Sequence, residues 1–190
     1  MNVLKRLYAR PGRVARPASV RTNIRKTLTQ ILRMWLVFLL AGPALLYHLE
    51  TRLGWARFRL KSPAWRGVGV ALFLLGWAVA GTSAIFIIIR GRGTPWPLEA
   101  PRQFVIAGPY LYVRNPMALG SISQGVAVGL FLRSPLVLIY ALLGALTWHF
   151  GARPWEERDL VQRFGPAYTH YRAHVRLWLP RRTRYVPPVR

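Results

Sequence analysis

The chain of 190 residues contains no cysteine, four histidines and only five acidic residues, against 28 lysines and arginines. Without cysteine, disulfide bonds, thiolate metal sites and cysteine nucleophiles are excluded. So few histidines and acids leave little material for a multi-ligand metal centre. Only His170 and His174, at i and i+4, have a metal-ligand spacing. Such a pair is typical of a solvated helix face, and we predict no metal site.

The shortage of acids gives a formal net charge of +23, yet 53% of the residues are hydrophobic. A soluble protein this basic would be a polar nucleic-acid binder. A disordered basic tail would be poor in aromatics, whereas this chain has 8 Trp, 8 Tyr and 8 Phe. The basic residues flank long hydrophobic segments, where they suit anionic lipid headgroups. We therefore predict contact with membrane lipids at the polybasic flanks and no nucleic-acid partner.

Four hydrophobic segments account for most of the apolar residues: 31–49, 67–89, 117–132 and 134–150. Crossing the hydrocarbon core takes about 20 apolar helical residues. The second segment has 23 residues without a charge, which is too long and too apolar for an ordinary soluble helix. Only Arg133 separates the last two, so we interpret them as a hairpin turning at Arg133-Ser134-Pro135. The sequence predicts an all-α integral membrane protein with about four transmembrane helices, including a C-terminal helical hairpin.

The basic residues also predict topology. With four spans and both termini inside, 21 Lys and Arg lie on the cytoplasmic side and 6 on the other. The positive-inside rule then favours cytoplasmic N and C termini, and we expect a bacterial inner membrane. Residues 1–30 are predicted to form a polybasic cytoplasmic segment, although a mitochondrial transit peptide has the same composition. The five basic residues at 50–66 allow that loop to lie along the membrane interface.

Ser121, Gly125 and Gly129 recur at intervals of four and share one helical face. Small residues on one face let another helix approach closely. A second interpretation is that they leave room for a ligand, and the sequence does not separate the two.

The loop at 90–116 has five prolines in 27 residues, which forbids a long helix. Phe104-Val105-Ile106 fits a short extended piece. Asn115 precedes a proline and so avoids the helical region, which leaves it at the entrance of the next helix. Free N–H groups at such an entrance bind anions. An N-cap that contacts lipid headgroups is the alternative.

A second polar segment follows the hairpin and holds three of the five acids, Glu156, Glu157 and Asp159. Pro154 can open a helix there, and acids suit its first turn. Alternatively, a carboxylate here binds a cation or accepts a hydrogen bond from a ribose hydroxyl. Arg114 would then pair with one of these acids. Phe164-Gly-Pro predicts that this helix is interrupted and that a segment rich in aromatic residues follows.

These two segments together resemble the isoprenylcysteine carboxyl methyltransferase family, which is related to the phospholipid methyltransferases. The family pattern Gly-x-Tyr-x-x-x-Arg-His-Pro-x-Tyr-x-Gly, a helical hairpin and a Glu-Glu-x-x-Leu-x-x-x-Phe-Gly stretch have counterparts here. The counterparts are Gly108-Pro-Tyr110-Leu-Tyr-Val-Arg114-Asn-Pro116-Met-Ala-Leu-Gly120, then Glu156-Glu157-Arg-Asp-Leu160-Val-Gln-Arg-Phe164-Gly165-Pro-Ala-Tyr168-Thr-His-Tyr171, and Trp178-Leu-Pro180. Gly93-Thr-Pro-Trp-Pro97 is similar to the loop that precedes the motif. The resemblance covers about half of the chain.

The resemblance implies that residues 31–190 form one membrane-embedded methyltransferase-like domain that uses S-adenosylmethionine. Its acceptor, a carboxylate or an amine, would be lipophilic or lipidated and would enter from the bilayer. The implied catalytic residues are Arg114, Asn115 and Glu157. The implied cofactor pocket comprises Tyr110, Arg114, Asn115, Pro116, Gly120, Glu156, Glu157, Tyr168 and Tyr171.

Two positions depart from the family pattern. Asn115 stands in place of the histidine and cannot act as an acid or base near neutral pH. Ala118 stands in place of a tyrosine, which removes a hydroxyl. Two other functions stay open: a non-catalytic membrane protein that retains the scaffold, favoured by Ala118, and a membrane oxidoreductase similar to sterol reductases.

Overall fold

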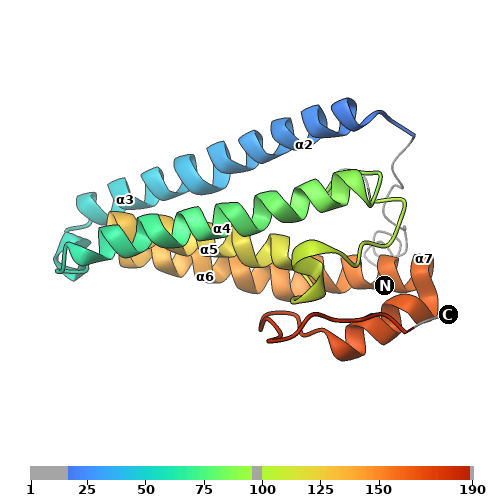
Figure 1. The fold of residues 1–190 in the computed structure, drawn as a ribbon. Helices are drawn as coiled ribbons and strands as arrows, with labels where there is room; N and C mark the ends of the chain where they lie inside the picture. Colours follow the sequence, from blue (N-terminus) through green and yellow to red (C-terminus); the bar gives the residue numbers. More distant parts are fainter. Residues whose placement is uncertain (1–16, 96–99, 189–190) are drawn as a thin grey trace, which may run out of the picture. The chain divides into compact units, whose positions relative to one another are not determined.

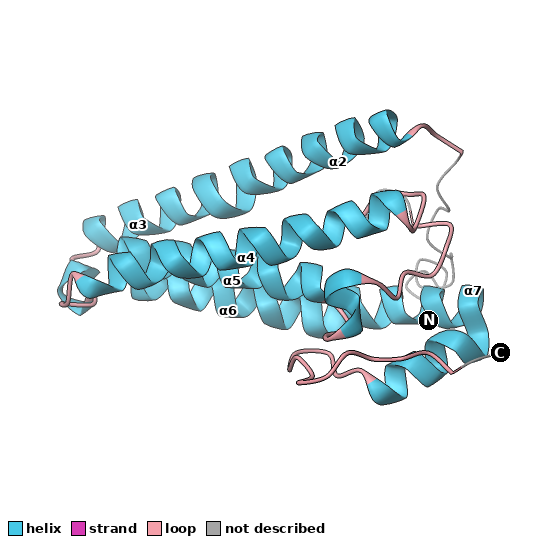
Figure 2. Cartoon of the chain, viewed as in Figure 1, coloured by secondary structure: helices cyan, strands magenta, loops and turns pink. Residues whose placement is uncertain are grey.

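The computed structural model describes residues 17–95 and 100–188. Apart from one bridge residue, Ala100, the regular structure of this part of the chain is helical (Figures 1 and 2), which confirms the predicted all-α class. Residue contacts divide the chain into two compact units. The first unit contains Met1–Thr27, Thr82–Asn115 and Trp148–Arg190, and the second contains Leu28–Gly81 and Pro116–Thr147.

The elements follow one another with few loops. They are α2 (Val20–Met34), the π-helix η1 (Trp35–Ala41), α3 (Gly42–Arg52), the 3-10 turn η2 (Trp55–Phe58), α4 (Ala64–Ile89), the 3-10 turn η3 (Gly108–Leu111), α5 (Pro116–Leu132), α6 (Pro135–Thr147), the π-helix η4 (Trp148–Ala152) and α7 (Arg153–His174). The first three join into one helix, Val20–Arg52, and the last three into another, Pro135–His174.

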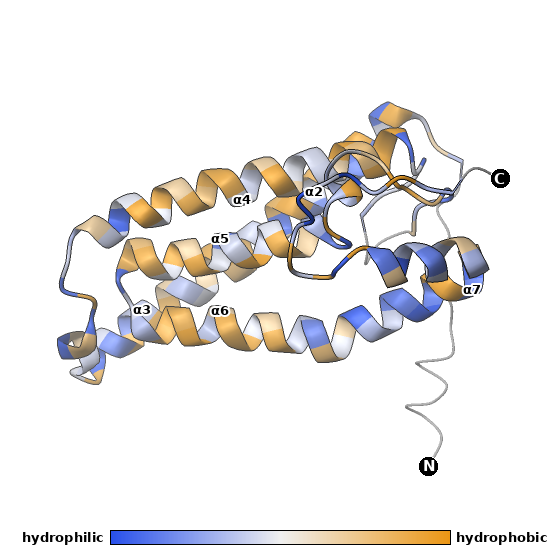
Figure 3. Cartoon of the chain, turned by 60° about the horizontal axis from the view of Figure 1, so that its bottom comes forward, coloured by the Kyte–Doolittle hydropathy of each residue, from blue (hydrophilic) through white to orange (hydrophobic). Residues whose placement is uncertain are grey.

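Within residues 17–95 and 100–188, three helices are long and apolar enough to cross a membrane: Val20–Arg52, Ala64–Ile89 and Pro135–His174; the apolar helix Pro116–Leu132 is shorter. Figure 3 shows hydrophobic residues along α4, α5 and α6, whereas α7 carries many hydrophilic ones. Seven of its 22 residues are charged, so we place the end of the last membrane-spanning segment near Ala152. Together with these features, the many exposed leucines and valines on the helices identify an integral membrane protein.

Two helix boundaries differ from the sequence-based expectation. The first helix begins at Val20 rather than near residue 31, because the polar residues of 20–30 continue the helical pattern. Pro154 lies in the first turn of α7, as predicted, but α7 follows the preceding helices without a break, so Pro135–His174 is one continuous helical stretch. The π-helical turn Trp148–Ala152 comes directly before this proline. A change of hydrogen-bond register there accommodates a residue that lacks an N–H.

The predicted break at Phe164-Gly-Pro is present as a kink within α7. Gly165 has φ +50° and ψ −127°, and Pro166 follows it. The left-handed φ is accessible to glycine without a steric penalty. The chain therefore changes direction here and continues helically to His174.

The second unit contains the predicted helical hairpin of α5 and α6. Arg133 at its tip has φ +58°, Ser134 N–H donates to the Gly129 carbonyl at 3.0 Å, and the Ser134 hydroxyl accepts from Val137 N–H at 3.2 Å. A Cβ on Gly129 would lie 2.7 Å from a Leu138 methyl, and one on Gly125 would lie 3.5 Å from Ala141. These glycines therefore serve helix packing, whereas Ser121 is exposed.

The first unit is organised around a core of Tyr168, Tyr171, Val175 and Tyr185, with Phe104 among the residues packed against it. Three backbone hydrogen bonds tie the C-terminal segment to the loop before α5. They run from Arg114 N–H to the Arg176 carbonyl at 2.9 Å, from Arg181 N–H to Tyr112 at 2.8 Å, and from Tyr185 N–H to Leu111 at 2.9 Å. The segment Phe104–Ile106 forms no strand. The C-terminal segment therefore fixes the loop that carries Arg114.

Candidate active site

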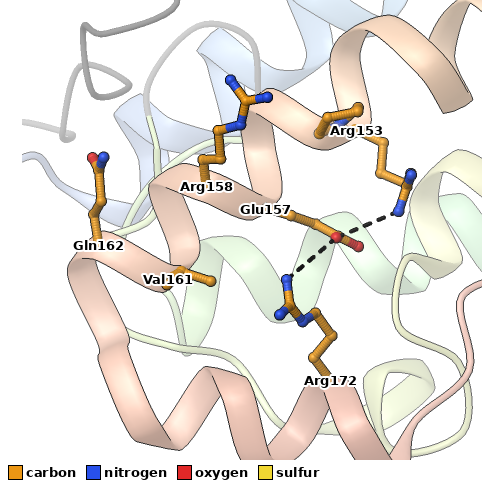
Figure 4. A pocket seen from close by; sticks show the side chains of 7 residues that line it. Arg153, Glu157, Arg158, Val161, Gln162 and Arg172 are labelled. Carbon is orange, nitrogen blue, oxygen red and sulfur yellow. Dashed lines mark hydrogen bonds and ion pairs between the residues drawn. The ribbon is translucent and has the colours of Figure 1, made fainter.

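The centre of the candidate site is Glu157, which is surrounded by arginines. Its carboxylate lies 3.5 Å from Arg114 Nε, 3.4 Å from Arg153 Nη1 and 3.9 Å from Arg172 Nη1. Figure 4 shows the pairs with Arg153 and Arg172. The expectation that Arg114 pairs with an acid of this segment is confirmed. Three guanidinium groups around one carboxylate leave the site with a net positive charge.

This cluster retains unused hydrogen-bonding capacity. Arg114 Nε and Glu157 Oε1 are both buried, and neither has a hydrogen-bond partner within the described residues. The 3.5 Å that separates them is an ion-pair distance without hydrogen-bond geometry. Buried polar atoms normally find a partner, and an unmade bond costs about 1–3 kcal/mol. A polar ligand group would satisfy both atoms.

A cavity of about 440 Å³ adjoins Glu157, within the range of about 300–1,000 Å³ that small-molecule sites occupy. Figure 4 shows the residues that line it: Arg153, Pro154, Glu157, Arg158, Val161, Gln162 and Arg172. Most share one face of α7, because Arg153, Glu157 and Val161 are spaced by four. Four of the seven residues are charged and two are apolar, so the cavity suits a ligand with both polar and apolar parts.

Most of these lining residues are absent from the sequence-based candidates. The i, i+4 spacing of Arg153 and Glu157 was a signal that could have identified Arg153. Arg172 gave no such signal, because it lies beyond the kink at Gly165 and reaches the carboxylate only through the change of chain direction.

Glu156 lies in a different environment from its neighbour. Its Oε2 accepts a hydrogen bond from Asn115 Nδ2 at 3.1 Å, and no ion pair within the described residues involves it. Burial, followed by the charge of Glu157, raises the pKa of Glu156 from 4.5 to about 7, while the Asn115 hydrogen bond opposes this rise. Glu156 thus titrates near neutral pH, and Asn115, expected to face an external anion, holds this carboxyl instead.

The three candidate tyrosines, Tyr110, Tyr168 and Tyr171, are buried and support the loop and the helix that carry the site. Tyr171 Oη donates to the Tyr110 carbonyl at 2.6 Å, and Tyr168 and Tyr171 are each 1% exposed. Burial raises the pKa of all three phenols, so each hydroxyl stays neutral. Tyr168 and Tyr171 belong to the aromatic core, and neither lines the cavity beside Glu157.

The remaining candidates, Pro116 and Gly120, belong to the second unit and lie on α5. A Cβ on Gly120 would lie 2.5 Å from the Gly76 carbonyl oxygen of α4. Helix packing alone therefore requires glycine there. The candidate loop at Gly93–Pro97 lies partly outside the described residues. Its described glycine packs against Pro101, which a Cβ would approach to 2.7 Å.

Metal-ligating side chains do not gather in the described ranges: no group of three or more His, Cys, Asp or Glu occurs there. The rings of His170 and His174 stack at 4.2 Å, and both residues are exposed. His170 Nδ1 is 2.8 Å from Tyr185 Oη, which attaches the C-terminal segment to α7.

A family model for phospholipid methyltransferases matches residues 65–167, more than half of the chain. The chain belongs to the phospholipid methyltransferase family. The matched range includes the loop with Arg114 and Asn115, the hairpin, and the Glu156-Glu157 pair. The resemblance inferred from the two motifs is therefore confirmed.

Three curated relatives are named as methanethiol S-methyltransferases. The protein from a Pseudomonas species is 29% identical over 73% of this chain and 55% of its own length. The Mycobacterium tuberculosis protein is 30% identical over 64% of this chain and 52% of its own length. The second enzyme of that name from Bradyrhizobium diazoefficiens is 29% identical over 67% and 53%. The chain thus spans about half the length of the curated relatives it matches.

Proposed function

We propose that this protein transfers a methyl group from S-adenosylmethionine to a lipophilic or membrane-delivered acceptor. The observation that carries the proposal is the Glu157 cluster: a buried carboxylate with three arginines and unused hydrogen-bonding atoms beside a cavity. Membership of a methyltransferase family supports the reaction class.

The Glu157 cluster and the cavity beside it fit the chemical groups of this cofactor. Arginine forks bind a carboxylate in bidentate fashion, and Arg114, Arg153 and Arg172 would hold the carboxylate of its amino-acid part. The free oxygen of Glu157 would accept from the ammonium group or a ribose hydroxyl. When bound, S-adenosylmethionine supplies an electrophilic methyl group on a sulfonium sulfur. Of the remaining sequence-based candidates, Tyr110, Tyr168 and Tyr171 are proposed to support the pocket through the packing of the first unit, whereas Pro116 and Gly120 stay candidates from the sequence alone.

The chain's own contribution to the reaction is positioning and proton transfer. Orientation of two reactants accounts for a large share of the barrier reduction in such displacements. A carboxylate acceptor needs no base, whereas an amine or thiol must lose a proton. Glu156 is suited to accept that proton, since its pKa is about 7. Asn115 holds the carboxyl through its amide, and Arg114 orients the anionic groups.

The acceptor class follows from membrane access. The resemblance of the two motifs implies a carboxylate or an amine on a lipophilic molecule, and the names of the three relatives add a small thiol. We further propose that residues 31–190 act as one membrane-embedded domain, with residues 1–30 and the C terminus in the cytoplasm of a bacterial inner membrane. This topology follows the positive-inside rule.

Calorimetric titration of S-adenosylmethionine into the detergent-purified full chain tests the cofactor. Wild type is expected to bind saturably, and Glu157→Ala and Arg114→Ala are each expected to bind more weakly. Arg184→Ala, an exposed arginine that does not line the cavity, is the matched control. No binding by folded wild type would overturn the proposal and turn attention to nicotinamide cofactors. Labelled methyl transfer to a carboxylate, an amine and a thiol of equal chain length then identifies the acceptor.

A further inference from the structure

The connection between α3 and α4 carries an unusual combination of side chains. Residues 51–66 contain five basic residues and no acid. Arg52, Arg57, Lys61 and Arg66 are exposed. Leu53 is 57% exposed, Trp55 43%, Phe58 58% and Trp65 39%. We call these eight residues the 52–66 surface.

The acid nearest in sequence, Glu50, is buried and does not contribute charge to this surface. Glu50 is 1% exposed, and its Oε2 lies 3.3 Å from Arg59 Nε. Arg59 also donates to Tyr47 Oη at 2.9 Å and to Thr51 Oγ1 at 2.7 Å, and its guanidinium lies 3.8 Å from the Tyr47 ring centroid. With Glu50 and Arg59 paired internally, every charge that the connection exposes is positive.

The connection is also held to the hairpin tip of the same unit. Leu60 N–H donates to the Arg133 carbonyl at 3.0 Å, and Arg133 Nη1 donates to the Lys61 carbonyl at 3.3 Å. Gly54, with φ +70°, starts the 3-10 turn of Trp55–Phe58. The exposed aromatic and basic side chains therefore project from a backbone with defined hydrogen bonds.

We propose that the 52–66 surface binds the anionic phospholipid headgroups of the membrane, with Leu53, Trp55 and Phe58 entering the interface. Tryptophan is enriched at membrane–water interfaces, and each basic residue near an anionic leaflet adds to the attraction. The surface also lies between two helices, Val20–Arg52 and Ala64–Ile89, that are long and apolar enough to cross a membrane. Charge complementarity favours this lipid surface over a basic or neutral protein partner.

The absence of cysteine makes a single labelled position straightforward. The full chain carrying Phe58→Cys would receive a polarity-sensitive dye and be placed in lipid nanodiscs. In separate samples, a small fraction of the phosphatidylglycerol or of the phosphatidylcholine would carry a quencher on its headgroup. The loss of dye fluorescence would then report which lipid lies near position 58. Leu142→Cys, on the apolar helix α6 and 58% exposed in the structure, serves as a deep reference that an acyl-chain quencher reaches.

The dye at position 58 is expected to emit as in an interfacial environment, and the anionic lipid is expected to quench it at least about twofold more than the zwitterionic lipid. The triple change Arg57→Gln, Lys61→Gln and Arg66→Gln should bring that ratio close to about one, as should high salt. Arg182→Gln with Arg184→Gln, two exposed arginines of the C-terminal segment, should leave it unchanged.

Three results would overturn the proposal. Water-like emission without headgroup quenching would show that the surface is not at the membrane. Equal quenching by both lipids in wild type would show that the surface enters the interface but does not prefer anionic headgroups. Energy transfer between two labelled copies in one nanodisc, with loss of lipid quenching, would show that a second copy covers the surface.

Discussion

Two of the carboxylates that pair with arginine in the described part of the chain, Glu50 and Glu157, differ in how completely their hydrogen-bonding positions are filled. Glu50 is almost fully buried, and Arg59 fills its remaining bonding positions with Tyr47 and Thr51. Glu157 has three arginines around it, yet its Oε1 and Arg114 Nε make no hydrogen bond within the described residues. Only Glu157 adjoins the cavity.

The difference distinguishes a pair that stabilises the fold from a pair available to a ligand. A saturated buried pair has no capacity left for a ligand, and removing one partner leaves a buried charge uncompensated. An unsaturated cluster next to a cavity is suited to binding, because a ligand completes bonds that the protein leaves unmade. The predictions below test this distinction, beginning with the largest expected effect.

Glu50→Gln is expected to destabilise the fold by about 3 kcal/mol, the lower end for a broken buried ion pair, because it leaves the part-buried Arg59 without its counter-charge. The affinity of the folded protein for S-adenosylmethionine should stay within about twofold. Denaturant or thermal unfolding in detergent measures the first effect, and calorimetry at low temperature measures the second. An equal loss of affinity would show that the two pairs are not separable.

Glu157→Gln is expected to give the opposite pattern. Loss of a charged hydrogen-bond acceptor costs about 2–3 kcal/mol of ligand binding, or about 100-fold in Kd. The thermal midpoint should change by only a few degrees, about 2–4 °C per kcal/mol for a chain of this size. Asp159→Asn serves as the control, since Asp159 pairs with Arg163 and does not line the cavity. Unchanged affinity would contradict the assignment of the site.

Tyr171→Phe tests a residue expected to affect both stability and ligand binding, because its hydroxyl donates to the Tyr110 carbonyl and so supports the loop of the site. Removing it leaves a buried carbonyl without this donor, at a cost of about 2 kcal/mol. We expect a lower thermal midpoint and a severalfold weaker affinity together. Thr169→Val, which removes an exposed hydroxyl on the same helix, should change neither by as much. A change in stability alone would separate the aromatic core from the site.

The smallest effect concerns pH. The folded-state pKa of Glu156 is raised to about 7, so between about pH 4.5 and 7 the folded state binds more protons than the unfolded state. Stability should therefore rise by about 1 kcal/mol as pH falls from 7 toward 4.5, the amount being limited because the side chain is only half-buried. Glu156→Gln should remove this slope in thermal unfolding. An identical slope in wild type and variant would refute the assignment.

Local patterns were sufficient to predict the helices and the motifs. Hydrophobic runs of membrane length, proline at 135 and the Gly165-Pro166 break indicated elements that the structure contains. They were insufficient for Pro154, where a π-helical turn continues the helix, because such a change of register depends on tertiary packing. They were equally insufficient for Tyr168 and Tyr171, whose spacing fits either a pocket wall or a core.

The sequence by itself determined the all-helical membrane class, the family and the pairing of Arg114 with an acid of the 156–159 segment, because hydrophobicity, charge and motif spacing are properties of the chain. Only the tertiary structure decided that Glu157 gathers three arginines while adjacent Glu156 has none. The kink at Gly165 returns Arg172 to the carboxylate, and Asn115 reaches Glu156 across 41 residues. Burial and distance set the chemistry of the two acids, and both are defined only in the folded chain.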